Sequence, residues 1–292
     1  MITGISLSSM KTTYKIGWFS TGNTKAALDL LQTVQTNIRQ GEITAEIAFV
    51  FCNRERGDSK RSDLFLDHVE ATNIPLICFS YPKYIATRGL TNPDPEKPLP
   101  DWRIDYDREV MALLPDSRLD LCVLAGYMMI TGKEMCQRYN MINLHPAAPG
   151  GPVGTWQQVI WQLIDSDAQN TGLLMNLVTP ELDKGPVVTY CTFSIRGEPF
   201  DNYWRDIKGR SAKEIRETEG KDNYLFKLIR EYSVARELPL IVSTIKALSQ
   251  GRVMITERKQ VVDSNSCIIK GYDLTDEIDK SLKRETIPTR LI

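Results

Sequence analysis

Apolar, strand-like runs alternate with helix-length segments through the first two thirds of the chain. Strands are expected at residues 15–20 and 45–51, where the runs are predominantly apolar. Between them Ala27, Val34 and Ile38 recur at helical spacing. Alternation at this pitch is typical of parallel βαβ units. The sequence therefore predicts an α/β fold with a doubly wound, mostly parallel sheet.

The same alternation continues to about residue 195. Further helices are expected at 61–72, 105–114, 131–139 and 156–166, and further strands at 74–80, 119–125, 141–144, 173–178 and 187–195. The last two strands flank a short turn, so we expect them to pair antiparallel. Residues 81–102 are rich in Pro and polar side chains, which predicts a long loop.

The final third is expected to form a helical C-terminal extension. Residues 201–250 have a helical pattern, and Pro239 should kink that helix or begin a new one. Residues 251–257 are expected to add a last strand. From Arg258 onward the chain is polar and charged, which is typical of a loose arm or an oligomer contact.

Composition excludes several function classes. A net charge of -1 over 292 residues offers no bulk attraction for nucleic acid or an anionic membrane, and no apolar stretch approaches membrane-spanning length. Six scattered cysteines without a CxxC pair predict reduced thiols, and hence a cytoplasmic protein. Two histidines and no clustered cysteines give no zinc-like ligand set, so no metal is expected.

The chemistry-bearing motif is Asn143-Leu144-His145, at the end of an apolar run and just before Pro146. On a strand, Asn143 and His145 would share one face. Asp183 follows in the tight turn 181–186. A carboxamide, an imidazole and a carboxylate can together bind an oxyanion and move a proton. Taken singly, the histidine is compatible with packing and Asp183 with turn formation.

A second candidate site lies between the first strand and the first helix. It comprises Gly22, Asn23, Thr24 and Lys25. Backbone N–H groups at a helix N-terminus favour a phosphate, and glycine permits close approach. Equally, Thr24 fits a simple helix cap. His68, within a helical segment, is interpreted as structural.

These motifs resemble the folate-dependent formyltransferases. The resemblance rests on 143–146, on 178–187 (VTPELDKGPV), on the strand end 124–128 (LAGYM) and on 106–109 (YDRE), and it extends over roughly residues 15–256. It is strongest to the branch of the family that formylates glycinamide ribonucleotide. The fold that it implies, a Rossmann-like α/β sheet, agrees with the alternation described above.

The resemblance implies roles for individual residues. Asn143, His145 and Asp183 would form the catalytic triad. A folate pocket would be lined by Met128, Met129, Ile130, Thr131, Val178, Thr179, Pro180 and Glu181. The substrate phosphate would bind Gly22, Asn23, Thr24 and Lys25, with Arg103 as a further substrate contact. The cosubstrate would be 10-formyltetrahydrofolate, with no metal, and the acceptor glycinamide ribonucleotide; a homodimer is also compatible.

The resemblance also divides the chain. Residues 1–256 would be the formyltransferase domain, with a phosphate- and nucleotide-binding half at about 15–125 and a catalytic and folate half at about 126–256. Residues 257–292 would be a charged C-terminal tail. An insertion at 199–223 is extra relative to compact members of the family.

Departures from the family pattern leave the acceptor open. Where the family places a Glu-His pair before an aromatic-Pro step, this chain has residues 233–239, SVARELP. Met129 stands where some members have arginine. A formyltransferase acting on a sugar amine, a formyltetrahydrofolate hydrolase and a non-catalytic nucleotide-binding module are the alternatives.

Overall fold

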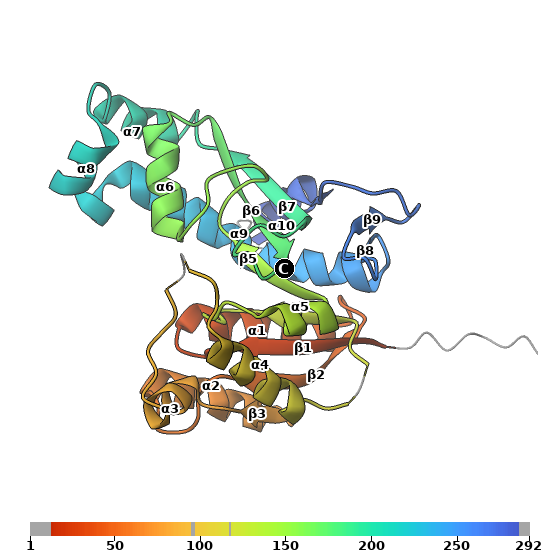
Figure 1. The fold of residues 1–292 in the computed structure, drawn as a ribbon. Helices are drawn as coiled ribbons and strands as arrows, with labels where there is room; N and C mark the ends of the chain where they lie inside the picture. The colour runs from red at the N-terminus through yellow and green to blue at the C-terminus, as the bar shows by residue number, and fades with distance from the viewer. Residues whose placement is uncertain (1–12, 95–96, 117, 286–292) are drawn as a thin grey trace, which may run out of the picture.

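The central element of the protein, seen in a computed structural model, is an eight-stranded sheet with the order β10-β7-β6-β5-β4-β1-β2-β3 (Figure 1). The structure describes residues 13–94, 97–116 and 118–285. Within this sheet β6 runs antiparallel to both its neighbours, and the remaining pairs are parallel. The predicted doubly wound, mostly parallel sheet is therefore confirmed.

The strands follow the apolar runs of the sequence. They are β1 (Tyr14–Ser20), β2 (Ala45–Cys52), β3 (Leu76–Cys78), β4 (Leu121–Leu124), β5 (Met141–His145), β6 (Asn170–Leu177), β7 (Val187–Ser194) and β10 (Tyr272–Asp273), with a separate hairpin of β8 (Val253–Ile255) and β9 (Val261–Asp263). The antiparallel pairing expected between β6 and β7 is confirmed.

The helices begin where polar side chains satisfy free backbone N–H groups. Thr24, Ser59 and Thr155 cap their helices, the last in a reciprocal capping box with Gln158. The helices are α1 (Lys25–Arg39), α2 (Lys60–Ala71), α3 (Tyr81–Thr87), α4 (Asp101–Leu113), α5 (Lys133–Arg138), α6 (Trp156–Asp165), α7 (Phe200–Asp206), α8 (Ala212–Thr218), α9 (Tyr224–Ser249) and α10 (Thr275–Glu285), with a 3₁₀ turn at Gly220–Asp222.

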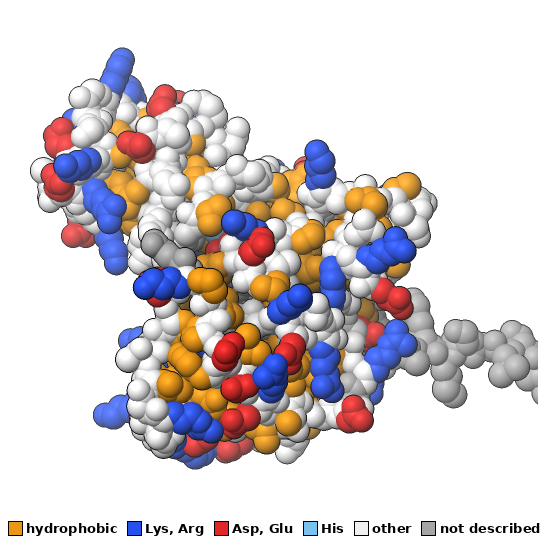
Figure 2. Space-filling view, viewed as in Figure 1, with side chains coloured by type: hydrophobic (Ala, Val, Ile, Leu, Met, Phe, Trp, Pro, Cys, Tyr) orange, Lys and Arg blue, Asp and Glu red, His pale blue; other side chains and the backbone are white. Residues whose placement is uncertain are grey.

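Two hydrophobic clusters cover the two faces of the sheet. One joins α1, α2, α6 and α9 to strand residues such as Trp18 and Ile142. The other joins α3, α4 and α5 to Phe19 and Met141 on the opposite face. In Figure 1, α6, α7 and α8 project from the half that holds β6 and β7, away from β1 to β3. Figure 2 shows cationic and anionic side chains interspersed on the face in view.

Two expectations about local structure are wrong, and one of the two alternatives for Pro239 is excluded. The stretch expected to be a loop, 81–102, contains α3 and the first residues of α4. Pro239 begins no new helix, because α9 continues through it, and the alternative of a kink at this residue stays a prediction. The expected loose arm is folded between Arg258 and the end of α10: β10 pairs with β7 as an edge strand, and α10 packs against α9. Residues 286–292 of the predicted tail lie outside the described residues.

The cysteines are free thiols, as the sequence predicts. Four are buried, Cys78 is half-buried and Cys267 is exposed. Burial raises the pKa of Cys52 to about 12, which leaves that thiol protonated and poorly nucleophilic.

Candidate active site

The site lies at the carboxyl edge of the sheet, next to the point where strand order reverses between β1 and β4. The loops after these two strands are hydrogen-bonded together. Ser20 Oγ donates to the carbonyl of Ala125 over 2.7 Å, and the backbone N–H of Met128 donates to Thr21 Oγ1 over 3.1 Å. The predicted phosphate loop and the predicted folate loop are therefore one connected structure.

The predicted phosphate loop opens α1. Gly22 has a φ of 64°, and a Cβ there would lie 2.8 Å from the Phe65 ring, so glycine is required. Thr24 Oγ1 caps the helix by accepting from Ala27 N over 3.1 Å. Asn23 accepts a hydrogen bond from Ser59, and the exposed Lys25 pairs with Asp29. The interpretation of Thr24 as a cap holds; binding of a substrate phosphate stays a prediction.

Asn143 and His145 lie on β5, on the same face of the strand as Met141. Elsewhere on the sheet this face is covered by α4 and α5. Asn143 is partly exposed, whereas the His145 side chain is only 8% exposed. His145 Nδ1 lies 3.5 Å from Asp183 Oδ2, and His145 Nε2 lies 3.2 Å from the carbonyl oxygen of Pro152. Both neighbours of the ring are acceptors, so each ring nitrogen has a place to donate a proton.

Asp183 reaches this histidine by an indirect route. Because β6 is antiparallel, Leu177 at its end lies opposite Ile142, near the start of β5. His145 is about 10 Å farther along β5 at the usual rise per residue. The turn after β6 must therefore fold back over the sheet to bring Asp183 to His145. The structure brings these two predicted catalytic residues together, with Asn143 two positions before the histidine.

Backbone geometry holds the returning turn in place. Asp183 has a φ of 54°, a left-handed conformation that Asp tolerates better than most residues. Thr179 Oγ1 donates to the carbonyl of Glu181 over 2.9 Å, and Leu177 N donates to the carbonyl of Pro186 over 2.8 Å. A Cβ on Gly185 would lie 1.6 Å from the carbonyl oxygen of Leu177. The close approach of two backbone segments thus requires glycine at 185.

Substitution Gly185→Ala is expected to displace the turn and with it Asp183. We expect a loss of roughly 1–3 kcal/mol in unfolding free energy from overpacking, together with a fall in kcat. Gly197→Ala is the control for backbone strain without a clash: its φ of 80° disfavours alanine, but nothing lies within 4 Å of a Cβ built there, so kcat should stay unchanged. Chemical denaturation and steady-state kinetics of both variants measure the two effects. Unchanged stability and kcat in Gly185→Ala would show that the turn adapts.

Apolar side chains stand exposed around these polar groups. Met128 is 80% exposed, Val153 57% and Leu182 51%. Val153 follows the Pro152 carbonyl, and Leu182 precedes Asp183, so both flank residues that contact His145. Exposed large apolar side chains beside a polar cluster are typical of a ligand site.

The other predicted folate residues differ in exposure. Met129 packs partly against the core, Thr131 is buried, and Ile130, Val178 and Thr179 are partly exposed, with Pro180 and Glu181 exposed. The Thr131 hydroxyl has no hydrogen-bond partner among the described residues. Their contact with a folate stays a prediction.

Arg103 is buried rather than open to a substrate. Its side chain is 1% exposed and pairs with Asp107 over 2.5 Å. The same guanidinium donates to the carbonyl of Ile130 over 2.7 Å, while Asp107 accepts from Gly132 N over 2.6 Å. The pair thus fastens the loop after β4 to α4. The predicted substrate contact is untested, and the observed contacts are those of a positioning residue.

Sequence reasoning missed Asn176. It lies on β6 directly opposite Asn143, is 4% exposed, and its Oδ1 has no hydrogen-bond partner among the described residues. Cross-strand neighbours in this arrangement have Cβ atoms about 5 Å apart. The sequence signal that could have found Asn176 is its place inside the apolar run 173–178, LLMNLV. A polar side chain buried in such a run needs a hydrogen-bond partner.

Arg236, in the segment that departs from the family pattern, is held by α10 and by its own helix. Its side chain is 11% exposed and contacts Asp279 of α10 over 3.1 Å, and it also donates to the carbonyl of Tyr232. Val234 is 43% exposed. His68 contacts Gln32 and Gln35 of α1, in agreement with its structural interpretation.

Two kinds of feature are absent from the described ranges. Residues 13–94, 97–116 and 118–285 contain no group of three or more His, Cys, Asp or Glu side chains that could hold a metal ion. In the same ranges, no helix combines the length and apolar character needed to span a bilayer.

Comparisons with known proteins agree with this geometry. A family model described as formyl transferase matches residues 16–198. A phosphoribosylglycinamide formyltransferase from Coxiella burnetii is 20% identical, with a TM-score of 0.58 over 89% of this chain and 98% of its own. Glycinamide ribonucleotide transformylase 1 from Symbiobacterium toebii is 18% identical, with a TM-score of 0.54 over 85% and 93%.

A solved structure of an enzyme named for a different reaction is also similar to this chain. A formyltetrahydrofolate deformylase from Pseudomonas syringae is 18% identical, with a TM-score of 0.53 over 86% of this chain and 66% of its own. At these identities the likeness shows the shared fold.

Proposed function

Because the chain belongs to the formyl transferase family, we propose that it transfers a formyl group from 10-formyltetrahydrofolate to the amine of glycinamide ribonucleotide. The observation that carries this proposal is the contact between His145 and Asp183, with Asn143 on the same face of β5. These three groups suit acyl transfer, which needs an oxyanion donor and a proton carrier.

Asn143 is the donor to the developing oxyanion in this proposal. Attack of the acceptor amine on the formyl carbon moves negative charge to the carbonyl oxygen. The partly exposed carboxamide of Asn143 can donate an N–H bond to that oxygen, worth about 3 kcal/mol by comparison with other oxyanion donors. Asn176, directly opposite on β6, is placed to fix the orientation of this carboxamide.

His145 and Asp183 move the proton in this proposal. The attacking amine must lose a proton and the leaving nitrogen must gain one. Asp183 Oδ2 faces His145 Nδ1 and is 13% exposed, so it can exchange a proton with the substrate and with solvent. For His145 Nε2 to donate to the oxyanion, its bond to the Pro152 carbonyl must be exchanged for one to substrate.

The surroundings support a folate as donor and a phosphate on the acceptor. Met128, Val153 and Leu182 offer exposed apolar surface for a pterin and its aromatic linker. The N-terminus of α1, behind Gly22, offers backbone N–H groups and the positive end of a helix dipole for a phosphate. No step in this proposal requires a metal or a covalent enzyme intermediate.

The test is a direct assay of purified protein with 10-formyltetrahydrofolate and separate acceptors. We expect tetrahydrofolate to form with glycinamide ribonucleotide, and not with a nucleotide-linked amino sugar or with water alone. Absorbance reports folate turnover, and mass spectrometry identifies the formylated product.

The other outcomes select the alternatives. Turnover without an acceptor would identify a hydrolase, and turnover only with the amino sugar would identify a sugar-amine formyltransferase. Folate binding without turnover would contradict catalysis by the three residues. In the segment that departs from the family pattern, Val234 is exposed and Arg236 pairs with Asp279, so this panel is needed to identify the acceptor.

A further inference from the structure

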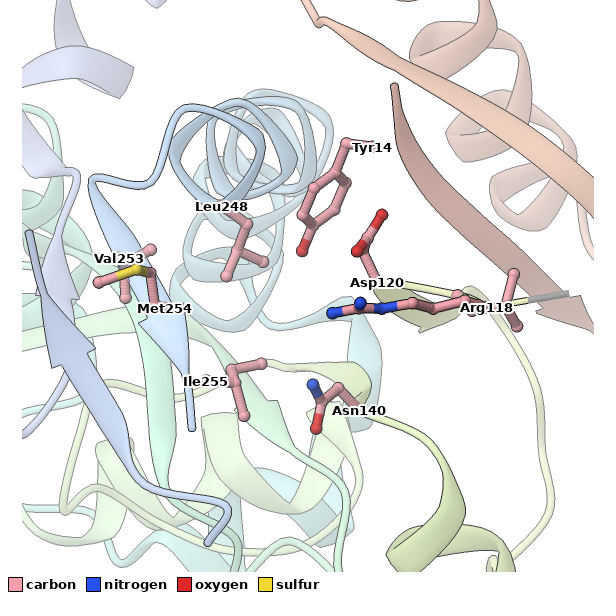
Figure 3. Close-up of a pocket in the computed structure, with 9 residues that line it drawn as sticks. Tyr14, Arg118, Asp120, Asn140, Leu248, Val253, Met254 and Ile255 are labelled. Carbon is pink, nitrogen blue, oxygen red and sulfur yellow. The ribbon is translucent and has the colours of Figure 1, made fainter. Parts of the chain in front are cut away.

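A cavity of about 270 Å³ lies at the amino-terminal edge of the sheet (Figure 3). Its walls include Tyr14 at the start of β1, Asp120 just before β4 and Asn140 just before β5. The active site lies at the opposite ends of these strands, and the seven residues of β1 span about 20 Å. The cavity is therefore separate from the proposed catalytic groups.

The polar groups of this cavity retain unused hydrogen-bonding capacity. Asp120 Oδ2 accepts from Lys15 N over 2.8 Å, which leaves Oδ1 available. Asn140 Oδ1 accepts from Lys259 Nζ over 2.8 Å, which leaves its NH₂ available. Among the described residues the Tyr14 hydroxyl has no hydrogen-bond partner and Arg118 has no ion-pair partner.

Two opposite charges line the cavity without forming a direct ion pair with each other. Figure 3 shows the Arg118 side chain extending between Tyr14 and Asn140, with the Asp120 carboxylate beside the Tyr14 hydroxyl. The salt bridges of the described residues do not join Arg118 to Asp120, although both line the same space. A guanidinium binds a carboxylate through paired N–H groups, and a carboxylate binds an ammonium group. The pair is complementary to a zwitterion.

The opposite wall is apolar and belongs to the C-terminal part of the chain. Leu248, at the end of α9, and Val253 of β8 are buried, and Met254 and Ile255 continue the surface. Figure 3 shows these side chains across the cavity from Arg118 and Asp120. A ligand that fits both walls has charged groups at one end and an apolar group at the other.

A side-chain bond holds the two walls together. Lys259, in the turn between β8 and β9, donates to the carbonyl of Tyr139 and to Asn140 Oδ1, each over 2.8 Å. The hairpin that supplies the apolar wall is thus attached to the two residues just before β5. A wall fixed in this way is pre-organised for a ligand, which lowers the ordering cost of binding.

We propose that this cavity binds a free α-amino acid with a branched or aromatic apolar side chain. The carboxylate would contact Arg118, the ammonium group Asp120, and the side chain the wall of Leu248 and Val253. The space of about 270 Å³ accommodates a molecule of this size. This assignment is independent of the proposed formyl transfer, because it depends on groups at the other edge of the sheet.

The test is isothermal titration of the full chain with L-leucine and L-phenylalanine. Three relatives of leucine each remove one recognition element: 4-methylpentanoate lacks the ammonium, 3-methylbutylamine lacks the carboxylate, and glycine lacks the apolar group. We expect one-to-one binding of leucine or phenylalanine, and at least about tenfold weaker binding of the three relatives. No binding of either amino acid up to about 10 mM, or equal binding of the relatives, overturns the proposal.

Two variants test the assigned charges. Arg118→Gln and Asp120→Asn are each expected to weaken leucine binding at least about tenfold. Asparagine at 120 can still accept from Lys15 N, so the strand end should stay intact. Arg216→Gln, in the remote helix α8, is the matched control and should bind leucine normally. Unchanged binding in folded Arg118→Gln protein, verified by circular dichroism, also overturns the proposal.

Discussion

Asp183→Asn is expected to lower kcat by about 10²–10⁴-fold while the dissociation constant for the folate changes little. Asparagine tolerates the left-handed backbone at this position and fills the same volume, so the turn should keep its shape. It cannot accept and release a proton at physiological pH, and it removes the negative charge facing His145 Nδ1. Single-turnover kinetics and folate titration separate the two quantities.

Asp167→Asn is the matched control for this variant. Asp167 also has a left-handed φ, 51°, and its exposed side chain pairs with Arg196 rather than with any of the three proposed catalytic residues. We expect its kcat to equal that of the wild type. If Asp183→Asn retained wild-type kcat, proton transfer through this carboxylate would be refuted. If it lost folate binding as well, a structural role of the turn would explain the result.

Arg103→Met is expected to destabilise the fold by about 3–5 kcal/mol, because it leaves the carboxylate of Asp107 buried without its cation. The side chain of Asp107 is 1% exposed and would retain only the bond from Gly132 N. The double variant Arg103→Met/Asp107→Leu should recover most of this loss, since the unpaired charge is gone. Urea unfolding of the wild type, Arg103→Met, Asp107→Leu and the double variant completes the thermodynamic cycle.

The stability deficit of Arg103→Met should depend on pH. Burial raises the pKa of Asp107, and the charge of Arg103 opposes that rise. Without Arg103 the folded-state pKa rises further above the unfolded value near 4. At a pH above the unfolded pKa of Asp107, folding must either protonate this carboxyl or bury it charged, and both cost free energy. The cost disappears at a pH below that pKa, where Asp107 is protonated in the folded and in the unfolded state. The deficit should therefore be largest at neutral pH and shrink towards pH 4.

Arg108→Met on the same helix is the control for Arg103. Arg108 is exposed and pairs with Glu134 on α5, so water screens both charges. We expect little change in its unfolding free energy, and no pH dependence like that of Arg103→Met. A deficit of equal size in both variants would show that loss of a long side chain from α4, rather than the buried charge, is responsible.

The local sequence determined most elements and the identity of the three polar groups. Strand and helix periods depend on neighbours two to four residues apart, so the alternation that predicts a doubly wound sheet is visible in the chain itself. Strand period also placed Asn143 and His145 on one face. An error arose where composition misled: the Pro-rich stretch holds α3, because the fixed φ of Pro82 suits a first helical turn.

Tertiary structure alone decided which distant groups meet. That β6 runs antiparallel, so that its turn folds back to bring Asp183 to His145, depends on contacts between strands far apart in the chain. The same holds for the burial of Arg103 against Asp107, for Asn176 opposite Asn143, and for the pairing of β10 with β7. Local periodicity specifies which face of an element is apolar, but long-range packing and pairing select the partner that covers it.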